Sequence, residues 1–334
     1  MNKHDEDYTG VLKVLQQAPD ESIDSISIDR AIHNGRGRIR RRRVLGGLAV
    51  VGVVGAAAFA APPLVDTFRD SPVAGQGPAQ VQPFGVWGRE FDIGTGGGFQ
   101  AVSYTTASRF QVIGLTTAAE PSHDGPIGDV TLLAPGLRPK STTGTKLPDI
   151  AGRPAVLVSS DDSGTKIVWQ YADDAWGTVM LYNTPENPVE RARQVAEGIH
   201  RRATPVPVKV PFTAPRRLLA DDLDVVMVRF PFVTPDASQL IEVTLGKTEP
   251  DATTGPGVPR FGVLRPGKNW KGSTKVNGRP ATVDDIGATI SGLGSGFAAT
   301  ITADRLPKMV DVAAGITLIS DPSDPTKGTD EPLR

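Results

Sequence analysis

Cysteine is missing from this sequence of 334 residues, and histidine occurs only four times. Without thiols the chain cannot form disulfide bonds, thiolate zinc sites or a cysteine nucleophile, so its folded parts must be held together by packing alone. The histidines, at positions 4, 33, 123 and 200, are widely separated and lack the spacing of metal ligands. We therefore expect no metal site, no Ser-His-Asp triad and no cofactor.

An excess of one charge is also missing, because 36 Lys and Arg residues nearly balance 37 Asp and Glu residues. This balance gives no electrostatic reason to expect nucleic-acid binding. The glycine-rich stretches at residues 94–98 and 292–296 do not continue into Gly-Lys-Ser/Thr, as phosphate-binding loops do, and we interpret both as flexible turns. Since the sequence contains no recognisable catalytic constellation, we predict that the protein is not an enzyme.

The most distinctive stretch is the uncharged run VLGGLAVVGVVGAAAFAAPPLV at residues 44–65. As a helix it would span about 33 Å, enough to cross about 30 Å of bilayer hydrocarbon, and we predict a transmembrane helix here. Four arginines come directly before it: Arg40, Arg41, Arg42 and Arg43. The positive-inside rule then places the N-terminus in the cytoplasm and the chain from about residue 66 outside. We expect these arginines to set the topology beside anionic membrane lipid.

A cleaved export signal is the alternative interpretation of this run. The residues Ala58-Phe59-Ala60 fit a cleavage site, and Arg42-Arg43 resembles a twin-arginine signal. The preceding 43 residues and the length of the apolar run favour a retained anchor.

The segments flanking the main body are expected to lack a folded core. Residues 1–43 are too short for an independent domain, and we expect a mostly disordered cytoplasmic tail, with docking to a cytoplasmic partner as the alternative. Residues 66–80 are expected to form a linker. Residues 320–334 are rich in Pro, Asp and Thr, and we predict a disordered tail there.

The region between these segments repeats itself. Four landmarks recur in the same order, with offsets that shrink from 131 to 117 residues: FQV and IEV at 110 and 241, LLAPG and VLRPG at 132 and 263, GRPA at 152 and 278, and VAEGI and VAAGI at 195 and 312. Each copy contains short strand candidates punctuated by turns and closes with a helix-like pattern. Asn187 is the expected cap of the first helix, with Pro188 in its first turn. The residues that recur at helical spacing, and so are expected on the inner faces, are Val189, Ala192, Val195, Ala196 and Ile199 in the first copy and Leu306, Met309, Val312, Ala313 and Ile316 in the second. We therefore predict an α+β protein in which one transmembrane helix is followed by two tandem copies, residues 81–203 and 204–319, each an antiparallel sheet with one packed helix.

Three aromatic residues are the candidate ligand-binding side chains. Trp169, Tyr171 and Trp176 lie on a hairpin predicted over residues 166–182, and the first two fall on one face at period two. They either pack in the core or line an apolar pocket beneath the sheet. The first copy is the better candidate for binding, because the second has ISGLGSGFAATI in place of this hairpin, with Ile290 or a neighbour and Phe297 replacing the tryptophans.

The stretch from residue 150 to residue 199 also carries a resemblance. It combines a Gly-Arg-Pro turn, a strand, the Trp-x-Tyr…Trp hairpin and a helix with Val-Ala-Glu-Gly-Ile. In this order it resembles extracytoplasmic domains of actinobacterial single-span membrane proteins of unknown function, often encoded beside extracytoplasmic-function sigma factors. It is also similar to domains of unknown function in Gram-positive proteins distantly related to the lipoprotein-carrier fold. The resemblance implies a membrane-tethered sensor, regulator or envelope component and implies no reaction.

Together these features predict a single-pass protein of the cell membrane whose outer region binds an envelope protein or an apolar ligand. Relay of that binding to a cytoplasmic regulator is a separate hypothesis. Two alternatives remain open. One is a carrier or chaperone for lipid or lipoprotein, in which a curved sheet over a helix encloses the cargo. The other is an exported hydrolase, for which the sequence offers no convergent polar cluster.

Overall fold

The computed structural model describes residues 80–117, 127–182, 186–219, 221, 223–231, 241–246, 259–266, 270–285, 287–294, 296–302, 307–322 and 327–334. The predicted cytoplasmic tail, the predicted transmembrane helix at residues 44–65 and all but the last residue of the predicted linker lie outside these ranges. Within them, no helix is both long enough and apolar enough to cross a membrane.

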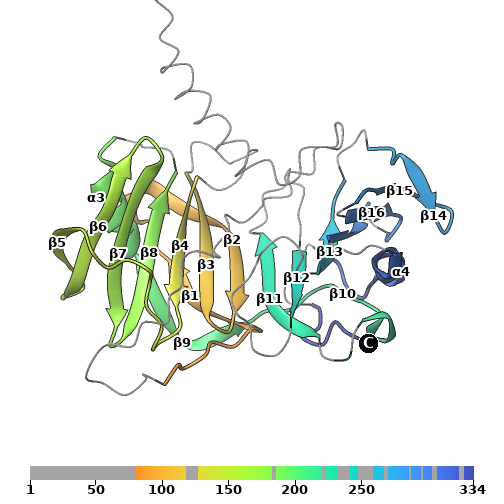
Figure 1. The fold of residues 1–334 in the computed structure, drawn as a ribbon, viewed down its shortest axis with the longest axis horizontal. Helices are drawn as coiled ribbons and strands as arrows, with labels where there is room; N and C mark the ends of the chain where they lie inside the picture. The colour runs from red at the N-terminus through yellow and green to blue at the C-terminus, as the bar shows by residue number, and fades with distance from the viewer. Residues whose placement is uncertain are drawn as a thin grey trace, which may run out of the picture. The chain divides into compact units, whose positions relative to one another are not determined.

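The described region is mostly antiparallel β-structure, with one sheet of 14 strands (Figure 1). Two smaller sheets pair β1 (Gly88–Ile93) with β9 (Ile199–Pro207) and β10 (Phe212–Thr213) with β18 (Thr317–Leu318). The helices are α3 (Pro188–Glu197) and α4 (Pro307–Gly315), with 3-10 turns η3 (Gly96–Gly98) and η4 (Arg216–Leu218). In chain order, the strands of the large sheet are β2 (Phe99–Ala107), β3 (Phe110–Thr117), β4 (Gly128–Leu133), β5 (Thr145–Ile150), β6 (Arg153–Asp161), β7 (Gly164–Ala172), β8 (Ala175–Leu181), β11 (Asp224–Pro231), β12 (Ile241–Gly246), β13 (Arg260–Leu264), β14 (Thr274–Val276), β15 (Arg279–Val283), β16 (Gly287–Ser291) and β17 (Ala298–Thr302).

The order of the strands in the large sheet is the same on both sides of a central pair. Outward from the antiparallel pair of β2 and β11, one side runs β2-β3-β4-β8-β7-β6-β5 and the other runs β11-β12-β13-β17-β16-β15-β14. We call β1 to β9 the first half and β10 to β18 the second half. The prediction of one sheet per copy is therefore corrected: Thr105 and Thr106 pair with Arg229 and Val228, which joins the strands of both halves into one sheet.

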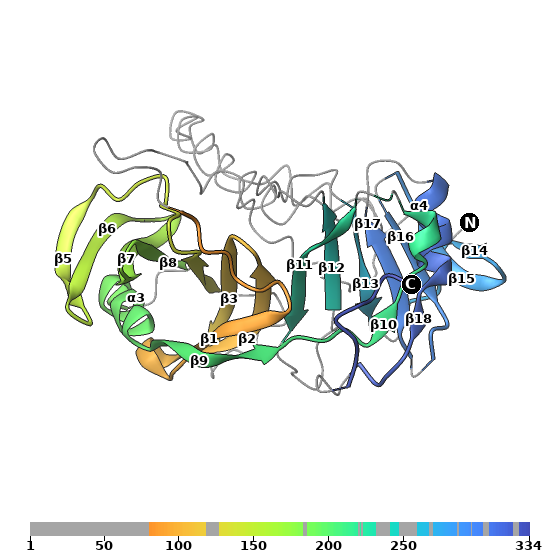
Figure 2. The same cartoon turned by 90° about the horizontal axis from the view of Figure 1, so that it is seen from below.

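One face of the sheet carries the core of the first half. The paired residues Ile113, Val130, Val179 and Ile167 form a row across β3, β4, β8 and β7, and all four are fully buried. Cross-strand partners share a face of a sheet, so the row presents one continuous apolar surface. The strands β5 to β8 curve around α3 (Figure 2), whose buried face consists of Ala192, Val195 and Ala196.

The helix predicted at the end of the first copy is present, but its capping differs from the prediction. Pro188 occupies the first turn, where its missing N–H is not needed. Asn187 makes no capping hydrogen bond with its side chain and has a left-handed backbone with φ of 53°. The glycine stretch at residues 94–98 is not simply a flexible turn, because Arg191 on α3 donates a hydrogen bond from Nε to the carbonyl of Gly97 at 2.8 Å.

The second half builds its core in the same manner. Val243, Phe261, Ile301 and Ala288 form the corresponding buried row across β12, β13, β17 and β16. The buried residues on and just after α4, Val312, Ala313 and Ile316, belong to the same apolar cluster. These three are among the residues that the sequence pattern placed on the inner face of the second helix.

Hydrogen bonds from side chains, and not backbone hydrogen bonds between paired strands, attach β1 to the large sheet. The buried amide of Gln111 on β3 donates to the Gly88 carbonyl at 2.7 Å and accepts from the Glu90 N–H at 3.0 Å. Thr106 on β2 donates to the Val86 carbonyl at 2.6 Å. Buried polar side chains of this kind are stable only when they are hydrogen-bonded, so they specify where β1 lies.

The predicted disordered tail needs a correction at its end. In residues 327–334, Thr329 exchanges two backbone hydrogen bonds of 2.9 Å with Val210, and Arg334 donates one of 3.0 Å to the carbonyl of Ala214. Leu333 packs against the core of the second half. The polar composition of this tail indicated disorder, but its backbone is hydrogen-bonded to the extended segment before β10.

Candidate functional site

The three aromatic residues proposed from the sequence do not share a cavity. Trp169 is 2 % exposed and belongs to the core of the first half. It lies directly across from Gly177, while Trp176 lies across from Gln170, so the two tryptophans point to opposite faces of the sheet. A Cβ atom on Gly177 would lie 2.5 Å from the Trp169 ring, so glycine is required for the indole to lie flat over β8.

Tyr171 and Trp176 are half-buried beside the same core. The Tyr171 hydroxyl donates to the Leu133 carbonyl at 2.6 Å, and its ring meets the edge of Phe91 at a centroid distance of 5.3 Å. Burial raises the pKa of the Tyr171 phenol above its usual value. The indole nitrogen of Trp176 is buried and finds no hydrogen-bond partner within the described part of the chain. The arginines at positions 40–43 lie outside the described residues.

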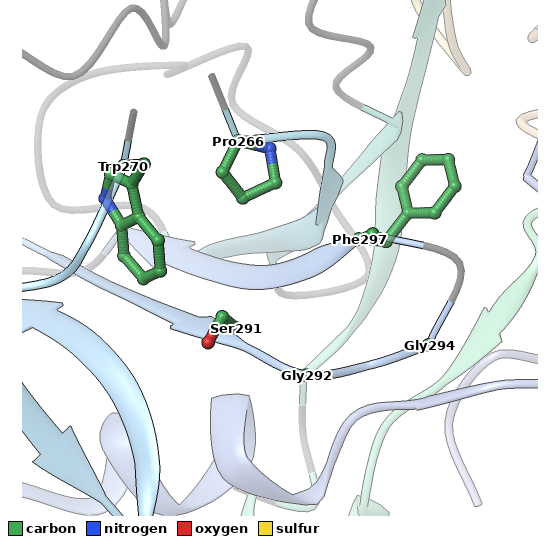
Figure 3. A pocket seen from close by; sticks show the side chains of 7 residues that line it. Pro266, Trp270, Ser291, Gly292, Gly294 and Phe297 are labelled. Atoms are coloured by element: carbon green, nitrogen blue, oxygen red, sulfur yellow. The ribbon is translucent and has the colours of Figure 1, made fainter. Parts of the chain in front are cut away.

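A pocket of about 390 Å³ lies instead in the second half, near one end of β16 (Figure 3). Its wall is made by Pro266, which follows β13, and by the half-buried ring of Trp270, which precedes β14. Opposite these two rings lie Ser291, the last residue of β16, and the loop that leads to β17. This volume is in the range that small-molecule sites in proteins occupy.

The loop between β16 and β17 forms the floor of the pocket. Gly292, Gly294 and Gly296 have φ values of 86°, 92° and 77°, which side-chain-bearing residues rarely adopt. A Cβ atom on Gly294 or Gly296 would meet nothing within 4 Å, so the absence of side chains leaves space there. The loop is held by the Phe297 N–H, which donates to the Gly294 carbonyl at 3.0 Å. The sequence stretch that we interpreted as a flexible turn is therefore a bent loop that borders a pocket.

The described lining of the pocket is neutral. Its described residues are one proline, one tryptophan, one phenylalanine, one serine and three glycines, and none of these carries an ionisable side chain. The Phe297 ring is 2 % exposed, and the guanidinium of Arg265 lies 4.9 Å from its centroid. The Ser291 hydroxyl donates to the Pro280 carbonyl at 3.0 Å, and its oxygen can still accept a hydrogen bond. Such a pocket favours an uncharged ligand with apolar or ring-shaped parts.

Two buried carboxyl groups lie on the sheet outside this pocket. Burial raises the pKa of Asp129 on β4 to about 6, against the opposing hydrogen bonds from Tyr182 and Thr131. Burial also raises the pKa of Glu242 on β12. Four strand steps separate β4 from β12, or about 19 Å at the usual strand spacing, so the two carboxyl groups cannot act on one bond. In the described ranges, no group of three or more His, Asp or Glu side chains is placed to hold a metal ion.

Comparison with protein-family models gives no match for this chain, and a search of curated proteins gives none either. The candidate site therefore depends on its own geometry. Sequence reasoning pointed to the tryptophan hairpin of the first copy and missed Trp270, which stands alone in the sequence between residues that form no regular pattern. The available signal was the run of alternating glycines at residues 292–296.

Proposed function

We propose that this chain is a single-pass membrane protein whose region from about residue 80 onward lies outside the cytoplasm and binds a neutral ligand in the pocket of Trp270. The arginine-flanked apolar run at residues 44–65 supports the anchor and the orientation. The observation that carries the binding function is a pocket whose described lining is uncharged and lies between two rings and a glycine-rich loop. Binding without catalysis fits the described lining, since none of the side chains found there is an acid, a base or an activated nucleophile.

A carrier that encloses lipid beneath Trp169 is less well supported than a binding protein. The concave face around α3 is filled by buried side chains, including the Trp169 ring itself. Relay of binding to a cytoplasmic regulator stays a hypothesis about residues 1–43, and a pull-down with that segment tests it.

The absence of native cysteine makes the topology directly testable. Thr142→Cys places a thiol on an exposed turn, and Asn2→Cys places one near the N-terminus. A maleimide that cannot cross membranes should label the Thr142→Cys protein in intact cells and label the Asn2→Cys protein only after lysis. Equal labelling of the two in intact cells would refute the proposed orientation.

The binding function is tested with a thiol inside the pocket. Ser291→Cys replaces a hydroxyl by a thiol at the pocket wall, and its rate of reaction with N-ethylmaleimide reports whether the pocket is occupied. We expect soluble material extracted from the cell envelope to slow this reaction and to leave the Thr142→Cys reaction unchanged. The protection should be lost when Trp270→Ala is added. If no extract slows the reaction at any concentration, the pocket is not a binding site for envelope material.

A further inference from the structure

The place of the pocket in the second half has a counterpart in the first. The strand β4 pairs with β8 as β13 pairs with β17, through Val130 with Val179 and Phe261 with Ile301. Two residues beyond the end of β4 lies Pro135, and two residues beyond the end of β13 lies Pro266. The β7–β8 turn likewise corresponds to the β16–β17 loop, because β8 and β7 follow β4 in the sheet of the first half as β17 and β16 follow β13 in the second.

In the first half this place is closed. The N–H of Gly136 donates to the carbonyl of Asp174 at 2.9 Å, so the turn after β4 is bonded directly to the β7–β8 turn. Arg138 adds an ion pair with the Asp174 carboxylate at 3.1 Å. Both turns are therefore held together where the second half has a pocket.

An extended piece of the chain also lies against the closed place. The N–H of Gln82 donates to the carbonyl of Pro135 at 3.0 Å. A Cβ atom on Gly136 would lie 3.1 Å from both the Gln80 carbonyl oxygen and the Val81 Cα, so the two backbones are in close contact. The segment Gln80-Val81-Gln82-Pro83-Phe84 carries no charge, and it enters the core at Phe84, which is 4 % exposed.

The second half has no such segment of its own among the described residues. The stretch that precedes β10 is residues 208–211, and its backbone is bonded elsewhere: Val208 donates to Trp87 and Val210 donates to Thr329, both at 2.9 Å. Within the described part of the chain, no backbone group donates to the Pro266 carbonyl. Among the described residues, the Pro266 carbonyl, which corresponds to the Pro135 carbonyl that accepts from Gln82, thus has no backbone donor beside the Trp270 ring.

We propose that the pocket of Trp270 binds an extended, uncharged stretch of polypeptide from a partner protein, with a backbone N–H of that stretch donating to the Pro266 carbonyl. This inference rests on the proposed binding function and names its ligand class. Proline-containing extended peptides bind to aromatic side chains in grooves, and their preformed conformation lowers the entropy lost on binding; Trp270 supplies one such side chain. The neutral side chains among the described lining match an uncharged ligand, because a charged side chain would find no partner among them for the hydration it loses.

The test uses the full-length protein carrying Ser291→Cys and a capped peptide with the sequence of residues 80–86. We expect the peptide to protect the thiol from N-ethylmaleimide in a concentration-dependent manner. N-methylation of the peptide nitrogen that corresponds to Gln82 removes one donor and should weaken protection about fivefold. Trp270→Ala should weaken it about tenfold or more, as expected for an aromatic anchor.

Two glycine variants provide a matched pair of controls. Gly294→Asn adds a side chain to the pocket floor, and Gly152→Asn adds the same side chain at another positive-φ glycine, at 75°, in a turn of the first half with equal open space. Only the first should weaken protection by the peptide. Equal weakening by both would overturn the assignment of the peptide to this pocket.

The outcomes separate the ligand class from the binding function. If envelope extract protects the thiol after complete digestion by protease and the peptide does not, the pocket binds a neutral small molecule or glycan and the peptide proposal is wrong. If the N-methylated peptide protects as well as the parent peptide, the Pro266 carbonyl is not the acceptor and the proposal is also overturned. If neither extract nor peptide protects, the proposed binding function fails as well.

Discussion

Replacing Asp129 by Asn is expected to make the protein more stable at neutral pH. Asp129 is 8 % exposed, and its carboxylate accepts hydrogen bonds from the hydroxyls of Tyr182 and Thr131. These contacts do not compensate for burial, which is the largest influence and raises the pKa from 3.8 to about 6. Asn keeps an oxygen that can accept from Tyr182 and carries no charge to desolvate.

The direction of the pH dependence follows from proton binding. Between about pH 4 and pH 6 the folded state holds a proton on Asp129 that the unfolded state has released, so stability falls as the pH rises through this window. A pKa raised from 3.8 to about 6 corresponds to about 3 kcal/mol. The Asp129→Asn protein should therefore match the parent near pH 3.5 and exceed it by up to about 3 kcal/mol at pH 7, or roughly 5–10 °C in melting temperature.

Chemical unfolding of both proteins from pH 3.5 to pH 7.5 tests this prediction, and the difference between them removes the contributions of other titrating groups. Asp162→Asn, on an exposed turn, is the matched control and should leave the difference near zero at every pH. Tyr182→Phe removes a hydrogen bond that favours the ionised carboxyl, so it should raise the pKa of Asp129 in the folded state and extend the window to higher pH. A difference between parent and Asp129→Asn that stays constant across the range would refute the reasoning.

Three further predictions concern packing and hydrogen bonding, each measured by chemical unfolding. Gly177→Ala should cost about 1–3 kcal/mol, because its Cβ overlaps the Trp169 ring. Trp169→Ile alone should cost about 2–4 kcal/mol. The variant that combines Gly177→Ala with Trp169→Ile should cost less than the sum of the two single changes, and strict additivity would contradict a direct contact between residues 169 and 177. Gln111→Leu should cost about 2–4 kcal/mol, since it leaves the Glu90 N–H and the Gly88 carbonyl without their partner. Deletion of residues 327–334 removes five backbone hydrogen bonds and should cost about 2–4 kcal/mol, whereas an unchanged midpoint would indicate that the tail does not stabilise the fold.

Local features of the fold were predictable from the sequence, and the joining of the sheet was not. The helix-like spacing of Ala192, Val195 and Ala196 correctly predicted the buried face of α3, because that pattern depends on one segment only. The pairing of Thr105 with Arg229 joins residues 124 positions apart on the first sheet strand of each half. Each of these two strands, β2 and β11, has one edge without a paired strand in its own half, and its sequence does not indicate which strand will pair with that edge.

The predicted correspondence between the halves is correct at one strand and displaced at another. Gly152-Arg153-Pro154 and Gly278-Arg279-Pro280 both open a strand after a turn, at the predicted offset of 126. The match of FQV at 110 with IEV at 241 aligns Val112 with Val243, yet Val243 lies in the core row and Val112 on the opposite face from Ile113. A shift of one residue in the alignment moves every side chain of a strand to the opposite face, and sequence similarity over three residues does not reveal such a shift.

The sequence could not decide between the two interpretations of the tryptophan hairpin for a related reason. Period two fixes which residues share a face of a strand, but it does not say whether that face is covered. The decisive residue is Gly177 on the neighbouring strand, which allows the indole to lie flat and fully buried. This partnership depends on the register of the hairpin and becomes visible only with the paired strands.

The same position in the second half shows how the cores of the two halves differ in packing. In the first half Trp169 pairs with Gly177, and at the same place in the second half Ile290 pairs with Ala299. The isoleucine side chain is smaller than the indole, and the alanine adds a Cβ atom that Gly177 lacks, so the core is filled in both halves. Core packing is thus conserved by exchanging both members of a pair, as close packing requires. The turn that follows this pair differs between the halves. Hydrogen bonds of Tyr171 and Asp174 close the β7–β8 turn of the first half, whereas three glycines leave the β16–β17 loop of the second half open beside Trp270. The same strand order therefore accommodates a closed turn in the first half and, in the described part of the second half, an open loop beside the pocket of Trp270.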